Sequence, residues 1–169
     1  PAADLVQRLS SEDAAAREQA WQDAGAAPID SIIAVAPLLD STQPEVARAG
    51  RLALERMVGA AGTDMEARAA AARALAVAII SVKNQDWLLW LLSYTGTDAA
   101  IPVLTAQLRA APEHTVPLLM ALEPIAMRRN ETGAATLYLE SELPRALLEI
   151  SATLPEPQQE AVINALGNI

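Results

Sequence analysis

The chain has 169 residues, a formal net charge of −9 at pH 7 and a hydrophobic fraction of 52%, and it contains neither cysteine nor phenylalanine. The lack of cysteine excludes disulfides, thiolate metal ligands and a cysteine nucleophile. The acidic balance argues against the basic face that nucleic-acid binding requires. Because alanine and leucine make up much of the hydrophobic fraction and favour helices, we expect an all-α domain.

Apolar residues at helical spacing, separated by Gly, Pro and polar breaks, predict a series of short helices and no sheet. In chain order the predicted helices cover 1–9, 11–25, 28–39, 44–59, 64–82, 87–94, 98–110, 112–122, 134–140, 141–150 and a final helix around 161–166. Ser10 or Ser11 is the expected N-cap of the second helix, and Thr63 that of the helix at 64–82. Residues 127–133 form the most loop-like segment.

Part of the chain repeats with a fixed offset of 68 residues. The offset relates Pro44-Glu45 to Pro112-Glu113, Ala53-Leu54-Glu55 to Ala121-Leu122-Glu123, Asp30 to Asp98, Ile33 to Ile101, and Val35 to Val103. A constant offset across two helical segments is typical of a repeat array, here of two units of roughly 34 residues. Leu54 and Leu122 should then be core positions of equivalent helices.

Three segments carry a family resemblance. Residues 40–49 (DSTQPEVARA) resemble the opening of a HEAT repeat, in which an Asp and a Pro precede a helix with an Arg and small residues. Residues 93–104 (SYTGTDAAIPVL) resemble the turn and second helix of such a unit. Residues 161–168 (AVINALGN) are similar to the start of a further unit in bacterial HEAT-repeat proteins, and 121–125 (ALEPI) fits that group.

The resemblance implies an α-α superhelix, a right-handed solenoid of about four to five HEAT-like helix pairs, with 1–169 as a single repeat domain. A fragment of a larger bacterial chain is an interpretation we keep open. The resemblance also implies that Arg48 and Asp40 bridge successive units, and that the second helix of each pair builds a concave binding face.

The aromatic residues Trp87, Trp90 and Tyr94, with Leu91, share one face of a helix that is apolar on all sides. Our leading interpretation is a middle helix buried between neighbouring repeats. The alternative is an exposed aromatic patch, because aromatic residues are enriched at binding hot spots. Trp87, Trp90 and Tyr94 are therefore the candidate partner-binding residues.

No catalytic, cofactor or metal site is predicted. His114 is the only histidine and is expected at a helix end, so a zinc site or a nucleophilic triad has no basis. The carboxylates of Glu140, Glu142, Glu156 and Glu160 are expected on solvated helix surface. The dispersed glycines form no phosphate-binding loop.

We therefore expect a non-catalytic protein-interaction or structural scaffold whose partner is another protein or a neighbouring domain of the same chain. The alternatives are a small-ligand protein related to phycobilin lyases and a nucleic-acid module of the HEAT-like glycosylase type. An acidic groove would argue against the nucleic-acid module, and lack of an apolar pocket near Trp87 or Trp90 against the lyase. No stretch is long and apolar enough to span a membrane. A soluble protein of the bacterial cytoplasm or cell envelope is expected, with its compartment and oligomeric state open.

Overall fold

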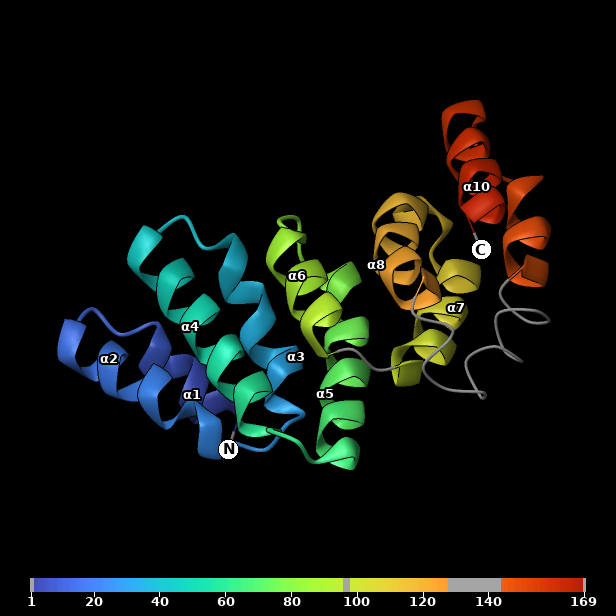
Figure 1. The fold of residues 1–169 in the computed structure, drawn as a ribbon. Helices are drawn as coiled ribbons and strands as arrows, with labels where there is room; N and C mark the ends of the chain where they lie inside the picture. Colours follow the sequence, from blue (N-terminus) through green and yellow to red (C-terminus); the bar gives the residue numbers. More distant parts are fainter. Residues whose placement is uncertain (1, 96–97, 128–143, 169) are drawn as a thin grey trace. The chain divides into compact units, whose positions relative to one another are not determined.

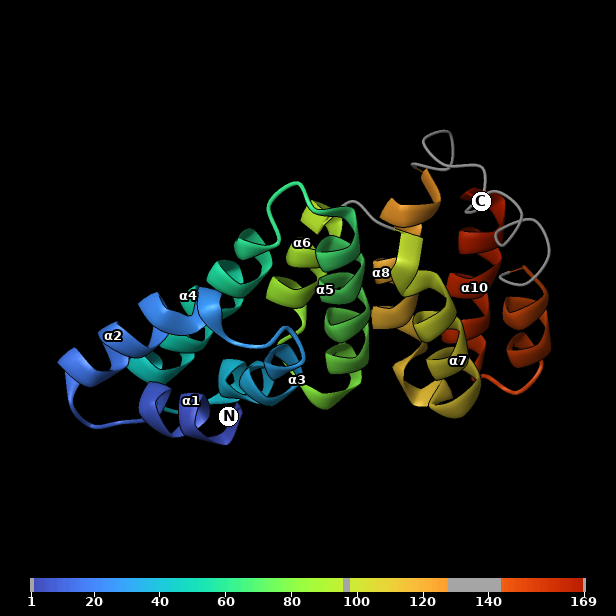
Figure 2. The same ribbon diagram turned by 90° about the horizontal axis from the view of Figure 1, so that it is seen from below.

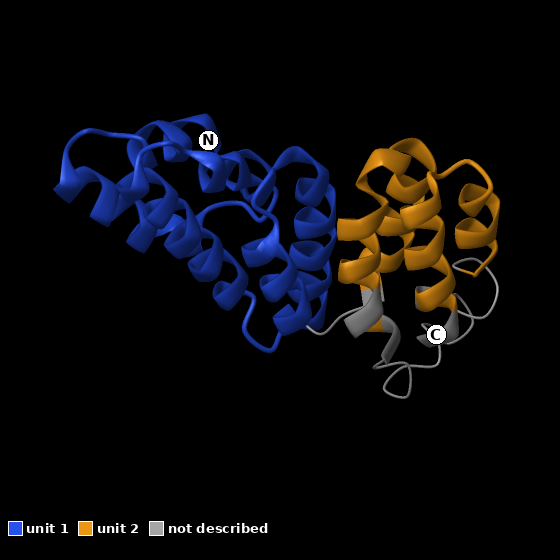
Figure 3. Cartoon of the chain, turned by 90° about the horizontal axis from the view of Figure 1, so that it is seen from above, with its two compact units in different colours: residues 1–97 blue, residues 98–169 orange. Residues whose placement is uncertain are grey.

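The computed structural model describes residues 2–95, 98–127 and 144–168, and within these ranges it contains helices and turns but no strand. The all-α expectation is confirmed for this part of the chain. The chain divides into two compact units, residues 1–97 (unit 1) and 98–169 (unit 2), which Figure 3 shows in different colours. The interpretation of 1–169 as one repeat domain stays a prediction.

Unit 1 consists of helices joined by short turns. Its α-helices are α1 (Ala2–Leu9), α2 (Ala14–Asp23), α3 (Ser31–Val35), α4 (Pro44–Ala60), α5 (Met65–Ala78) and α6 (Asp86–Thr95). Short 3-10 helices extend three of them: η1 (Ala24–Ala26) follows α2, η2 (Ala36–Asp40) follows α3, and η3 (Ile79–Ser81) follows α5.

The helices of unit 1 lie in two layers (Figures 1 and 2). In one layer α3 contacts α1 on one side and α5 on the other, and in the second layer α4 contacts α2 and α6. Consecutive helices pack across the layers, α1 on α2, α3 on α4 and α5 on α6. The core between the layers consists of fully buried aliphatic side chains, among them Leu9, Ile32, Leu54, Leu75 and Leu88.

Two helices begin at a different cap from the one the sequence predicts. Asp13, not Ser10 or Ser11, is the N-cap of α2, and its carboxylate accepts the backbone N–H of Ala15 at 2.9 Å. Asp64, not Thr63, caps α5 by accepting the backbone N–H groups of Glu66 and Ala67 at 2.9 and 3.1 Å. An aspartate both satisfies free N–H groups and places negative charge at the positive end of the helix dipole.

The helix predicted at 28–39 is shorter and changes form within that range. α3 covers only Ser31–Val35, and η2 continues the chain as a tighter 3-10 helix. Pro37 lies in this stretch and has no N–H to donate to the carbonyl four residues earlier, which explains the change of hydrogen-bonding pattern.

Asp40 anchors the segment that precedes α6. Its carboxylate oxygens accept the backbone N–H groups of Lys83 and Asn84 at 2.7 and 2.9 Å. The sequence resemblance implies a bridge between Asp40 and Arg48, but this carboxylate is engaged by backbone donors that lie more than forty residues further along the chain. Asp40 thus links the end of η2 to the segment that leads into α6.

Unit 2 contains η4 (Asp98–Ala100), α7 (Ile101–Ala110), η5 (Pro112–His114), α8 (Thr115–Met127), a helix at 144–151 and α10 (Glu156–Asn168). α8 packs against both α7 and α10, and an ion pair of 3.5 Å joins Arg109 of α7 to Glu149. The helix predicted at 134–140 and most of the predicted loop at 127–133 lie outside the described residues.

Candidate binding groove on unit 1

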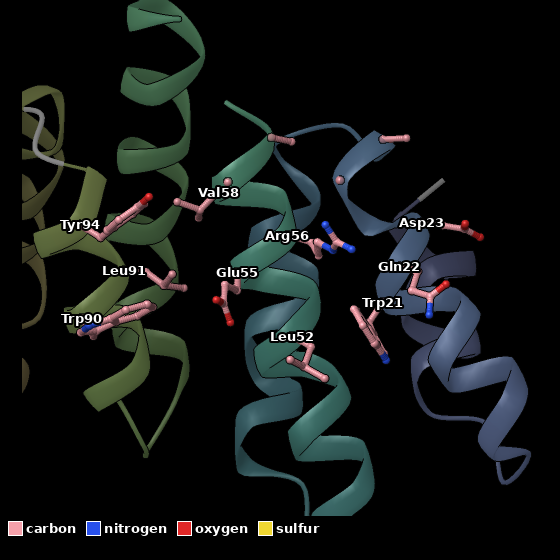
Figure 4. Close-up of a pocket in the computed structure, with 14 residues that line it drawn as sticks. Trp21, Gln22, Asp23, Leu52, Glu55, Arg56, Val58, Trp90, Leu91 and Tyr94 are labelled. Carbon is pink, nitrogen blue, oxygen red and sulfur yellow. The ribbon is translucent and has the colours of Figure 1, made fainter. Parts of the chain in front are cut away.

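A groove of about 850 Å³ lies across the layer formed by α2, α4 and α6 (Figure 4). Its lining residues include Trp21 from α2, Leu52, Glu55 and Arg56 from α4, and Trp90 and Tyr94 from α6. The second helix of each consecutive pair therefore contributes to one hollow, because these three helices occupy the same layer of unit 1.

On the α6 wall of the groove, Trp90 and Tyr94 belong to a stack of three aromatic rings that begins at Trp87, beside the lining residues. The rings of Trp87 and Trp90 have centroids 4.8 Å apart at an interplanar angle of 29°, and those of Trp90 and Tyr94 are 6.0 Å apart at 18°. The spacing of three and four residues puts the rings on one helix face, where offset stacking favours this arrangement. The stack continues from the half-buried Trp87 to the exposed Tyr94.

The exposed fractions of the α6 side chains decide between a fully buried helix and an exposed aromatic patch. Trp90 is 46% exposed and Tyr94 is 65% exposed, whereas Leu88, Leu91 and Leu92 are buried. Burial of all faces of the helix, our leading interpretation, is therefore wrong for the face that carries Trp90 and Tyr94. The physical reason is that α6 contacts α5 and α4, and the three leucines fill these contacts and leave the aromatic side uncovered.

The opposite wall contains Trp21, whose ring lies under the guanidinium group of Arg56. The guanidinium carbon is 5.8 Å from the ring centroid, within the range of a cation–π interaction. Neither Trp21 nor Arg56 is among the candidate partner-binding residues predicted from the sequence. Their pairing depends on the contact of α2 with α4, which no local pattern reveals.

The charged groups around the groove differ in how they are engaged. Asp23 accepts hydrogen bonds from Arg8 and from Gln19, and the Arg8 guanidinium, followed by the Gln19 amide, lowers the pKa of the Asp23 carboxyl group below its ordinary value. Glu55 is exposed, and among the described residues no ion pair or hydrogen bond engages its carboxylate. Glu55 extends from α4 on the side of α6, and Arg56 on the side of α2 (Figure 4).

A smaller hollow of about 210 Å³ adjoins the end of α6 and shares Tyr94 with the groove. Here the guanidinium group of Arg68 donates hydrogen bonds to the backbone carbonyl oxygen of Thr95, from Nε at 3.0 Å and also from Nη2. A cation at the carbonyl end of a helix satisfies free acceptors and interacts favourably with the helix dipole. This contact fixes the end of the helix that carries Tyr94.

The other residues considered from sequence form no second site in the described part of the chain. His114 ends η5, where its Nε2 atom is 3.9 Å from the neighbouring Glu113 carboxylate. Glu156 and Glu160 are exposed, whereas Glu140 and Glu142 lie outside the described residues. Within the ranges 2–95, 98–127 and 144–168, no group of three or more His, Asp or Glu side chains is arranged to hold a metal ion.

No protein-family model matches the chain, and neither a curated protein nor a solved structure is significantly similar to it. The resemblance to HEAT repeats therefore stays a prediction. None of the helices in the described ranges combines the length and apolar character that crossing a bilayer requires.

Proposed function

We propose that the chain is a non-catalytic scaffold of HEAT-like repeats whose groove on unit 1 binds a segment of a protein partner. The observation that carries this proposal is the groove wall formed by Trp90 and Tyr94, two large aromatic side chains that remain exposed beside a well-packed core. Exposed aromatic anchors in a hollow are the kind of residue that dominates binding energy at protein interfaces.

The arrangement of unit 1 supports the repeat interpretation. Consecutive helices pair across two layers, and neighbouring pairs contact one another within each layer, as stacked repeats require. Asp30, Asp64 and Asp98 are spaced 34 residues apart, and each precedes or begins a helical segment. A right-handed solenoid with a concave face of second helices is the architecture that extends this pattern.

A catalytic role finds less support in the groove. A general base needs an oriented partner, and a nucleophile needs a base within hydrogen-bonding reach. Three of the described lining residues are charged: Asp23, Glu55 and Arg56. Asp23 forms an ion pair with Arg8, and Arg56 lies over the Trp21 ring. Among the described residues that line the groove there is no histidine, serine or threonine.

The groove supports the two alternative functions to different degrees. Its volume falls within the range of about 300–1,000 Å³ that small-molecule sites occupy, and it lies beside Trp90, which favours a lyase-like small-ligand function as the second candidate. A nucleic-acid module is disfavoured, because the described lining residues include two acidic side chains, Asp23 and Glu55, and one basic side chain, Arg56, whereas phosphates require a basic surface.

Selection of random peptides displayed on phage against the whole chain tests the proposal. Selected peptides should bind the wild type and the control variant Met65→Ala, whose substituted side chain is exposed outside the groove, but not the double variant Trp90→Ala/Tyr94→Ala. Circular dichroism verifies that each variant folds. Peptides that bind the double variant equally well would contradict the proposal. Saturable binding of biliverdin, abolished in the double variant, would favour the small-ligand alternative instead.

A further inference from the structure

We propose that the groove on unit 1 selects a basic segment, in which an arginine or lysine side chain pairs with the Glu55 carboxylate and lies against the rings of Trp90 and Tyr94. This inference rests on the proposed binding function of the groove and names the chemistry of the partner. It follows from the electrostatic state of three charged side chains and from the accessible aromatic surface beside one of them.

Two of the three charges in the groove are already engaged by the protein itself. Asp23 accepts hydrogen bonds from the Arg8 guanidinium and the Gln19 amide, and the lowered pKa of its carboxyl group agrees with this engagement. The Arg56 guanidinium lies over the Trp21 ring. Each of these groups would have to give up an existing interaction to bind a partner.

Glu55 is the charge that remains available. Its carboxylate is exposed, lines the groove, and has no hydrogen bond or ion pair with any described residue. A partner's cation can therefore pair with it without displacing an internal contact, whereas a partner's carboxylate placed there would be repelled. The groove thus presents one unpaired negative charge on the side of α6 (Figure 4).

The aromatic stack complements this charge. Trp90 lies between Trp87 and Tyr94 in the stack, so among the described residues the groove-lining ring face that has no aromatic partner is the outer face of Tyr94. The face of an aromatic ring attracts cations, and a guanidinium group can stack on it while its N–H groups pair with a carboxylate. Trp90 and Tyr94 are held in place by the stack that begins at Trp87, so a bound side chain meets a fixed surface. Arginine suits this combination better than lysine because its planar group uses both contacts at once.

The charge of the whole unit acts in the same direction. Unit 1 contains twelve Asp and Glu residues against eight Arg and Lys residues, which gives a net charge of −4. A negative field attracts a basic segment before contact and raises its association rate. Binding should consequently weaken as ionic strength rises, since salt screens charges at a solvent-exposed site.

The phage-selected peptides provide the test. Arginine and lysine should be enriched among peptides that require Trp90 and Tyr94, and replacing the enriched arginine by citrulline, its neutral analogue, should weaken binding. Glu55→Gln should weaken the arginine peptide by about three- to fivefold, as expected for a solvent-exposed ion pair. It should leave the citrulline peptide unaffected. Glu45→Gln is the matched control, because Glu45 is exposed on the same helix but does not line the groove.

A charge swap makes the test sharper. Glu55→Lys should reduce binding of the arginine peptide and restore binding of a peptide in which the same position is glutamate. If the selected peptides require Trp90 and Tyr94 but show no basic enrichment, or if Glu55→Gln and Glu45→Gln behave alike, the basic partner is wrong while the binding groove stands. If no selected peptide requires Trp90 and Tyr94, both proposals are overturned.

Discussion

The indole N–H of Trp87 donates a hydrogen bond to the backbone carbonyl oxygen of Arg51 across 3.3 Å. The bond joins α6 to α4, and the same indole ring stacks on Trp90. It therefore ties the aromatic wall of the groove to the helix that carries Glu55. A phenylalanine at position 87 retains a ring for stacking but has no donor.

We predict that Trp87→Phe lowers the free energy of unfolding of unit 1 by about 1 kcal/mol, the usual net value of one hydrogen bond. Tryptophan fluorescence during urea denaturation reports on unit 1, because all three tryptophans lie in it. The control is Trp90→Phe at an exposed ring, with an expected change of less than about 0.5 kcal/mol. Equal losses for the two variants would show that the hydrogen bond contributes nothing.

Substitution by alanine at two glycines of α4, Gly50 and Gly59, should change the free energy of unfolding in opposite directions. A Cβ atom at Gly50 would lie 2.9 Å from the Cβ atom of Leu38 in η2, so α4 and η2 approach closely only without a side chain there. A Cβ atom at Gly59 meets nothing within 4 Å. Alanine is otherwise the better helix former by about 1 kcal/mol.

Gly50→Ala should therefore destabilise unit 1 by about 1–3 kcal/mol through overpacking, whereas Gly59→Ala should stabilise it by about 0.5 kcal/mol, since the position is near the helix end. Urea denaturation followed by tryptophan fluorescence measures both. A stabilised Gly50→Ala variant would mean that η2 moves away from α4 at little cost.

The 68-residue offset correctly predicts equal burial for some pairs of equivalent positions but not for others. Leu54 and Leu122 are both buried, as their offset requires. Ile33 is 39% exposed, whereas its equivalent Ile101 is buried. The difference follows from local geometry: Ile33 belongs to the five-residue α3, which passes into a 3-10 helix, whereas Ile101 begins the ten-residue α7. The rotation of a side chain about its helix axis depends on such details.

The candidate site could be predicted only in part. Spacing alone puts Trp87, Trp90 and Tyr94 on one face, but their exposure depends on which sides of α6 are covered by α5 and α4. Trp21 and Glu55 are 34 residues apart in sequence and reach the groove from two different helices, α2 and α4. No periodicity within a single helix encodes such an encounter, because it arises when neighbouring helices of one layer pack side by side.

The repeat interpretation leads to a pair of core substitutions. We predict that Leu54→Ala and Leu122→Ala each destabilise the unit that contains them by about 2–5 kcal/mol, since both side chains are almost completely buried and leave a cavity. Tryptophan fluorescence measures the effect on unit 1. Far-UV circular dichroism reports on the helices of both units, and comparison with the tryptophan signal of unit 1 gives the transition of unit 2, whose sequence has no tryptophan.

Leu148→Ala is the control for unit 2, because Leu148 is exposed and its loss should change the free energy of unfolding by less than about 0.5 kcal/mol. An effect of less than about 1 kcal/mol at either buried leucine lies below the range for cavity-forming changes and would contradict the assigned repeat register.

We predict that the ion pair between Arg8 of α1 and Asp23 of α2 contributes to the pH dependence of the stability of unit 1. Hydrogen bonds from Arg8 and Gln19 lower the pKa of Asp23 below its ordinary value of 3.8. A carboxyl group with a lowered pKa in the folded state stabilises the fold above its unfolded-state pKa, and this contribution is lost as the pH falls through the folded-state pKa. Asp23→Asn should therefore be less stable than the wild type at neutral pH, by an amount that shrinks below about pH 4.

Urea denaturation of Asp23→Asn and the wild type between pH 3 and pH 7 measures this difference in the free energy of unfolding. When Arg8→Gln is added to both the wild type and Asp23→Asn, the pH dependence of that difference should diminish. If it persists, a group other than Arg8 lowers the pKa of Asp23.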